Sequence, residues 1–184
     1  MSTVNIIREF LKRQRKYASF FEWSDKGQKE LGIVETLIQS VAFQGAETFL
    51  NLRISPKDPP DCIAEGQSGN LIGFEVRELV DEEAVRLNAQ GKEVYRNWTV
   101  DEVIKELESI IVEKDYKTFH GGPYKKLILV IHTDEFVLDF QTLKPVLETH
   151  EFRKTNKIAE AYLLFSYDPE REHFPYSQLK FAVL

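Results

Sequence analysis

Two short strand-like segments joined by a glycine-containing turn constrain the fold of this chain more than any other feature. The segments Asp61–Ala64 and Leu71–Leu79 are rich in apolar residues and each has the length of a strand. Between them, Gln67-Ser68-Gly69-Asn70 has the composition of a turn. The pattern therefore predicts an antiparallel hairpin.

Charged residues occupy particular positions on these two predicted strands. Asp61 follows Pro59 and Pro60 at the start of the first, whereas Glu75 and Arg77 lie on the second. Side chains two residues apart along a strand share a face, so Glu75 and Arg77 point the same way. The hairpin can bring Asp61 and Glu75 together at one end. Two carboxylates in one place need a cation between them, or one of them must hold a proton.

A predicted helix from about Asp25 to Phe43 adds a third carboxylate. Its apolar residues between Leu31 and Val41 recur at three- and four-residue spacing, which is typical of a helix with one buried face. Glu30 lies four residues before Val34 and therefore on the side that faces the sheet. Glu35, at the edge of the apolar stripe, is the second choice for a site carboxylate.

The remaining elements complete an α/β pattern. Helices are predicted at about 4–21, 100–116 and 140–147, and further strands at 47–54, 127–131, 161–166 and 179–184. Thr99 and Glu102 have capping-box spacing at the start of the helix at 100–116. This order predicts a mixed central sheet flanked by helices. With 184 residues, the chain is expected to form a single domain.

The order of helix, three strands, helix and strand, together with Pro60-Asp61 and Glu75-Val76-Arg77, resembles the core of the PD-(D/E)XK nuclease superfamily. The segment around Glu30 is similar to the first helix of archaeal Holliday-junction resolvases. The resemblance covers about residues 26–131, leaving an N-terminal helical extension at 4–21 and C-terminal additions at 136–184. It implies the restriction endonuclease-like fold, with an αβββαβ core.

The resemblance also implies a metal site and a reaction. Asp61, Glu75 and the backbone carbonyl of Val76 would hold Mg²⁺ or Mn²⁺, a set of oxygen ligands that suits such a cation. Glu30 would support the site from the preceding helix. The bound cation would polarise a nucleic-acid phosphodiester and lower the pKa of the attacking water.

Arg77 departs from the family pattern, which has lysine at this position. Arginine stays protonated, so it can contact a phosphate but cannot act as a base. A lysine from elsewhere could take that role: Lys57, Lys92 and Lys114 are candidates. Lys114 is the most suggestive of the three because it continues the apolar stripe of the helix at 100–116, and the alternative interpretation is a lysine at a helix end that extends its ammonium into solvent.

Three interpretations of the function follow. The first is a divergent Mg²⁺-dependent endonuclease-like protein in which Arg77 contacts the scissile phosphate. The second is a catalytically inactive binding module on the nuclease fold, a partner protein in defence, immunity or a mobile element, with Arg77 paired internally to Glu75 or Asp61. The third is an unrelated α/β domain, in which Glu30, Asp61 and Glu75 would be scattered.

Composition limits the partners and the location. The net charge of −6 argues against a general nucleic-acid coat, although Arg8–Lys16 is locally basic and is either a solvated helix face or a phosphate-contacting arm. The single cysteine, Cys62, excludes an internal disulfide. No apolar run approaches the ~18 residues of a membrane span, so a cytoplasmic protein is expected. DNA, a second copy of the chain and a protein partner are the candidate partners.

Overall fold

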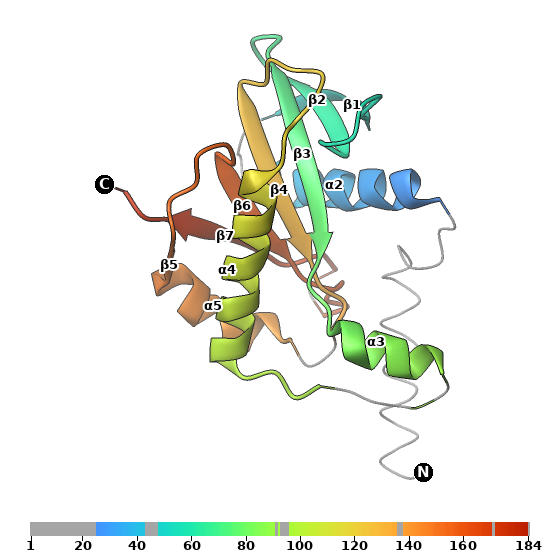
Figure 1. The fold of residues 1–184 in the computed structure, drawn as a ribbon, viewed down its shortest axis with the longest axis vertical. Coiled ribbons are helices and arrows are strands. Elements are labelled where there is room, and N and C mark those ends of the chain that lie inside the picture. The colour runs from blue at the N-terminus through green and yellow to red at the C-terminus, as the bar shows by residue number, and fades with distance from the viewer. Residues whose placement is uncertain are drawn as a thin grey trace.

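A mixed sheet forms the centre of the molecule (Figure 1). The computed structural model describes residues 25–42, 48–90, 92, 96–135, 138–170 and 172–183. Within this part of the chain the sheet has seven strands. In spatial order they are β1 (Phe49–Ile54), β2 (Cys62–Gly66), β3 (Leu71–Glu78), β4 (Lys126–His132), β6 (Glu160–Leu164), β7 (Tyr176–Phe181) and β5 (Glu151–Phe152).

The strand directions divide the sheet into two parts. β1, β2 and β3 form an antiparallel meander, which confirms the predicted hairpin between Asp61 and Leu79. β3, β4 and β6 run parallel to one another, and β7 returns antiparallel to β6. The prediction of a mixed sheet flanked by helices is therefore confirmed.

Helices cover both faces of this sheet (Figure 1). α2 (Lys26–Ala42) packs on one face, where Ile33, Val34 and Leu37 join a core with alternate residues of β2 and β3. α4 (Val100–Tyr116) and α5 (Phe140–Thr149) cover the other face, and their apolar residues pack against β4, β6 and β7. The two cores use opposite sides of the same strands, as alternation along a strand requires.

The helix α4 begins and ends where the sequence predicts. The hydroxyl of Thr99 accepts a hydrogen bond from the backbone N–H of Glu102 at 3.3 Å, and the Glu102 carboxylate accepts one from the Thr99 N–H at 2.8 Å. This is the capping box expected from the spacing of the two residues. It fixes the start of the helix whose last turn contributes to the site described below.

Several boundaries and two elements differ from the prediction. The helix α3 (Glu82–Ala89) and the two-residue strand β5 were not predicted, because neither is long enough to show a clear apolar period. The last strand ends at Phe181 and begins earlier than expected. The predicted helix at 4–21, with the basic cluster Arg8–Lys16, lies outside the described residues.

The length and apolar character of the helices decide whether one of them could span a membrane. Of those in the described ranges, none combines the length and the apolar character that crossing a membrane requires.

Candidate metal centre

The start of β2 places Asp61 against β3 because the strand ladder stops there. The last paired residues are Cys62 and Phe74, and continuing that register would set Pro60 opposite Val76. Proline has no backbone N–H to donate. The N–H of Val76 instead donates to Oδ2 of Asp61 at 2.7 Å, so the interrupted ladder fixes the Asp61 carboxylate.

The same interruption leaves the carbonyl of Val76 without a donor from the ladder. Within an extended strand, the N–H and C=O of one residue face the same neighbouring strand. The Val76 N–H faces Asp61, so the Val76 carbonyl faces that side too, where Pro60 offers no N–H. Leu71 and Leu79, which lie an odd number of residues from Val76, bond to the opposite side: the Leu71 carbonyl accepts from the N–H of Lys125, next to β4, and the Leu79 N–H donates to the carbonyl of His132 in β4.

Three carboxylates converge at this end of the hairpin. Asp58, Asp61 and Glu75 each offer an oxygen, and these oxygens lie within 4.8 Å of one another. Asp61 is 6% exposed and Glu75 is 2% exposed, whereas Asp58 lies at the surface. Two buried acids and one exposed acid thus form a group that a cation can reach from solvent.

Two lysines from the end of α4 pair with the most buried of these acids. The ammonium groups of Lys114 and Lys117 each lie 2.7 Å from Oε1 of Glu75. Lys114 is itself buried. The other carboxylate oxygen, Oε2 of Glu75, is buried and has no hydrogen-bond partner among the described residues. One oxygen of Glu75 is therefore neutralised and the other is left for a ligand.

Burial sets the protonation of the neighbouring groups. Desolvation raises the pKa of Asp61 to about 7; the Glu75 charge adds to the increase, and the Val76 N–H opposes it. Burial, with a smaller effect of the Lys29 charge, lowers the pKa of His132 to about 3, which keeps its ring neutral. Burial raises the pKa of the Cys62 thiol to about 12, so this cysteine is no nucleophile at neutral pH.

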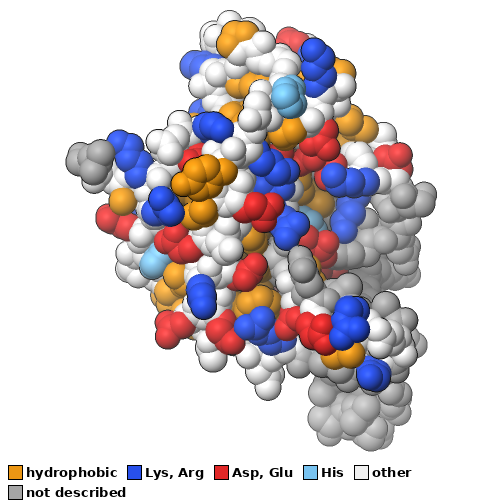
Figure 2. Space-filling view, in the orientation of Figure 1, with side chains coloured by type: hydrophobic (Ala, Val, Ile, Leu, Met, Phe, Trp, Pro, Cys, Tyr) orange, Lys and Arg blue, Asp and Glu red, His pale blue; other side chains and the backbone are white. Residues whose placement is uncertain are grey.

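The three carboxylates, Lys114, Lys117 and His132 line one cavity of about 240 Å³, which we call the carboxylate cavity. Its lining has five acids and five cations, so the charges balance. The acids are Glu30, Asp58, Asp61, Glu75 and Glu78, and the cations are Lys26, Lys29, Arg77, Lys114 and Lys117. Figure 2 shows that acidic and basic side chains are also interspersed over the face of the molecule that carries α4.

The residues predicted from the sequence mostly meet in this cavity. Glu30, Val76 and Arg77 line it together with Asp61 and Glu75. The acids are therefore not scattered, which is the arrangement that would have indicated an unrelated α/β domain. The side chain of Glu30 is 14% exposed and pairs with Lys26 at 3.2 Å, which places it at the edge of the cavity as a neutralised carboxylate.

Three other candidates do not line the cavity. Glu35 is exposed and does not line the cavity, because its position on α2 turns it away from the sheet. Lys57 and Lys92 are also exposed and lie outside the cavity lining. Among the lysines proposed to replace the one missing from β3, the structure brings Lys114 to the carboxylates.

Sequence reasoning missed two members of the site, Asp58 and Lys117. Asp58 lies three residues before Asp61, across the pair Pro59-Pro60, and a turn can fold it back onto the strand start. Lys117 lies three residues after Lys114, the spacing at which helical side chains share a face. Both spacings are visible in the sequence.

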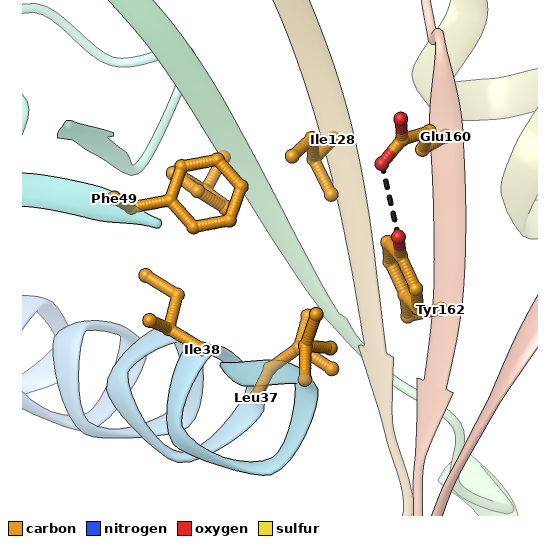
Figure 3. A pocket seen from close by; sticks show the side chains of 8 residues that line it. Leu37, Ile38, Phe49, Ile128, Glu160 and Tyr162 are labelled. Carbon is orange, nitrogen blue, oxygen red and sulfur yellow. Dashed lines mark hydrogen bonds between the residues drawn. The ribbon is translucent and has the colours of Figure 1, made fainter. Parts of the chain in front are cut away.

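A second cavity, of about 210 Å³, lies between α2 and the sheet and is mainly apolar (Figure 3). Leu37, Ile38, Phe49 and Ile128 contribute to its wall. Its one carboxylate, Glu160, accepts a hydrogen bond from the Tyr162 hydroxyl at 2.9 Å and pairs with Lys126 at 2.6 Å. Because its polar groups already have partners, this cavity offers less chemistry than the carboxylate cavity.

Comparison of the chain with protein-family models, curated proteins and solved structures finds no match.

Proposed function

We propose that this chain is a divergent Mg²⁺-dependent endonuclease-like protein of the PD-(D/E)XK type, which hydrolyses nucleic-acid phosphodiesters. The observation that carries the proposal is the convergence of Asp58, Asp61 and Glu75 within 4.8 Å, with Lys114 at 2.7 Å from Glu75. Carboxylates grouped beside a buried lysine supply both a cation site and a positive charge for a phosphate.

Three features support a divalent cation in this site. The grouped carboxylates are hard oxygen ligands. Oε2 of Glu75 has no hydrogen-bond partner in the described part of the chain. The carbonyl of Val76 has no donor from the strand ladder, so Asp61, Glu75 and Val76 can together hold Mg²⁺ or Mn²⁺. When bound, such a cation polarises a phosphate and lowers the pKa of a water molecule.

The side chains around the carboxylates have complementary roles in this proposal. Lys114 is buried and fixes the orientation of the Glu75 carboxylate. Lys117 is more exposed, with 35% of its side chain accessible, so its ammonium can turn toward a phosphate oxygen. Arg77 lines the same cavity, and its planar guanidinium suits two phosphate oxygens at once. β3 has arginine where the family pattern has lysine. In this proposal the lysine ammonium groups of the site come instead from Lys114 and Lys117 at the end of α4.

The rival proposal is a catalytically inactive binding module on the same fold. The observation that favours it is the pairing of both Lys114 and Lys117 with Glu75, which neutralises this buried acid without a metal. In that case the balanced charges of the cavity would be structural. Mn²⁺ would then leave the thermal midpoint of the protein unchanged.

Substitution of Asp61 tests the proposal. Asp61→Asn keeps the shape of the side chain and the oxygen that accepts from Val76 but removes the charge. We expect the wild-type protein to cut single-stranded, duplex or branched DNA with Mg²⁺, and Asp61→Asn to show background cleavage with an unchanged circular dichroism spectrum. The matched control is Glu35→Gln, which replaces an exposed acid of α2 outside the cavity lining. This variant should cut like the wild type.

Two outcomes count against the proposal. Cleavage by Asp61→Asn at the wild-type rate would place the chemistry elsewhere. A wild-type protein that cuts none of the substrates, and whose thermal midpoint does not respond to Mn²⁺, would favour the inactive binding module.

A further inference from the structure

An exposed aromatic ring lies beside a basic segment at the C-terminal end of α4, next to the candidate metal centre. Tyr116, the last residue of α4, is 75% exposed. A shallow hollow separates this last turn from the segment between β5 and β6. We call it the Tyr116 hollow, and its rim includes Tyr116, Arg153, Lys154, Thr155 and Asn156.

The basic segment is held firmly against the end of the helix. The carboxylate of Asp115 accepts hydrogen bonds from the backbone N–H groups of Asn156, Lys157 and Ile158 at 2.9, 2.8 and 3.1 Å. The ammonium of Lys157 donates to the carbonyl of Tyr116 at 3.3 Å. The Tyr116 hollow therefore has a fixed position relative to α4.

That position connects the hollow to the carboxylate cavity. Lys157 also donates to the carbonyl of Lys117 at 2.5 Å, and the ammonium of Lys117 lies 2.7 Å from Glu75. The hollow and the cavity thus lie on two sides of one helix end, and a helix is about 10 Å across. An extended chain that leaves the hollow can pass over the end of α4 and reach Lys117.

The charged groups of the hollow are available for a ligand. Arg153 and Lys154 are exposed and pair with no acid in the described part of the chain. Segment 151–157 contains three cations and a single acid, Glu151. Of these three cations, Lys157 already donates to carbonyls at the end of α4.

We infer that the Tyr116 hollow binds an unpaired nucleotide of a single-stranded nucleic acid. The base stacks on the ring of Tyr116, and the flanking phosphates contact Arg153 and Lys154. Aromatic rings stack with any base, and adjacent cations neutralise the backbone. A base inside a duplex has both faces covered by its neighbours, so the hollow selects a single strand. The inference rests on the proposed function and assigns its substrate class.

Binding without metal tests the inference independently of cleavage. The probe is a fluorescein-labelled oligothymidylate of about 20 nucleotides, followed by fluorescence anisotropy in EDTA, with a duplex of equal length for comparison. We expect Tyr116→Ala to weaken binding of the single strand about tenfold. Tyr116→Phe, which keeps the stacking surface, should bind like the wild type.

The basic residues have their own readout in the dependence of affinity on salt. Each phosphate contact on a single strand contributes about 0.7 to the slope of log affinity against log salt. The double variant Arg153→Ala/Lys154→Ala should therefore lower this slope by about 1.4. The matched control Lys105→Ala/Lys144→Ala removes two exposed lysines from α4 and α5 and should keep the wild-type slope.

Three results would overturn the inference. One is an unchanged affinity of Tyr116→Ala for the oligothymidylate. Another is tighter binding of the duplex than of the single strand. The third is that polyglutamate displaces the probe as effectively as unlabelled oligothymidylate does. That result would identify the hollow as a surface that binds an acidic protein.

The inference and the proposed function can fail separately. A wild-type protein that binds the oligothymidylate in EDTA, with the expected loss in Tyr116→Ala, but cuts no nucleic acid with Mg²⁺ would overturn the proposed function alone. A protein that cuts, and whose Tyr116→Ala variant binds normally, would overturn the inference alone.

Discussion

Glu75 shows how a single residue can be stable in the core and still available for chemistry. Its side chain is 2% exposed, and an isolated charge at that depth is costly. Lys114 and Lys117 both meet Oε1, so the charge is compensated on one oxygen while Oε2 keeps its capacity for a ligand. The site thus depends on two lysines that touch the same atom.

Removing the buried lysine should be far more costly than removing the exposed one. We expect Lys114→Met to lower the free energy of unfolding by about 3 to 5 kcal/mol, because it leaves a buried carboxylate without its most buried partner. Lys117→Met, at a side chain that is 35% exposed, should cause a smaller loss. Urea denaturation of both variants measures the difference. Equal losses would contradict the assignment of Lys114 as the structural partner.

His132 predicts a dependence of stability on pH. Its pKa falls from 6.5 to about 3 on folding because its ring is buried. The unfolded chain therefore binds a proton below pH 6.5 that the folded protein excludes, and the free energy of unfolding decreases as the pH falls toward 3. The slope for one proton is at most about 1.4 kcal/mol per pH unit.

His132→Gln isolates this effect. The raised pKa of Asp61 acts in the opposite direction, but both proteins share it. We expect the stability difference between wild type and His132→Gln to grow with pH between 3 and 6.5, as measured by denaturation at several pH values. A difference that stays constant over this range would show that His132 is not a buried neutral ring.

At the scale of elements, the last turn of α4 joins the two proposed binding surfaces. Lys114 and Lys117 face the carboxylate cavity, while Asp115 holds the segment between β5 and β6. Tyr116 points outward between them. Successive residues of a helix point in different directions. The four residues 114–117 can therefore contact the carboxylate cavity, the segment between β5 and β6, and solvent.

Loss of Asp115 should release the segment from the helix. Asp115→Ala removes the acceptor of the backbone N–H groups of Asn156, Lys157 and Ile158. An unsatisfied buried donor costs about 1 to 3 kcal/mol, so we expect a loss of stability of about that size, together with faster hydrogen exchange at residues 156–158. Glu113→Ala, at an exposed position of the same helix, is the control. Unchanged exchange in Asp115→Ala would contradict the anchoring role.

At the scale of the whole molecule, the candidate site lies where the antiparallel part of the sheet ends. The β2 ladder stops before Asp61, which lets the first turn of α2 and the last turn of α4 reach the same cavity from opposite faces. Pro60, which has no N–H to pair with Val76, is therefore central to the architecture of the site.

The sequence predicted this arrangement where local patterns were strong. α4 has a capping box and a regular apolar stripe, and the hairpin of β2 and β3 has a clear turn, so both could be placed. Glu35 could not be excluded because one step around a helix separates a buried from an exposed position. Asp58 and Lys117 depend on how a proline-containing turn and a helix end fold back, which is set by tertiary packing rather than by local preference.

The proposed function depends on a divalent cation bound at Asp61 and Glu75. The most direct test is anomalous diffraction from a crystal soaked in Mn²⁺. We predict a peak within about 2.5 Å of carboxylate oxygens of Asp61 and Glu75, with Lys114 still paired to Glu75, and no peak in a crystal of Asp61→Asn. A crystal of the wild-type protein with no Mn²⁺ at these carboxylates would overturn the proposed metal site and identify Lys114 and Lys117 as the permanent partners of Glu75.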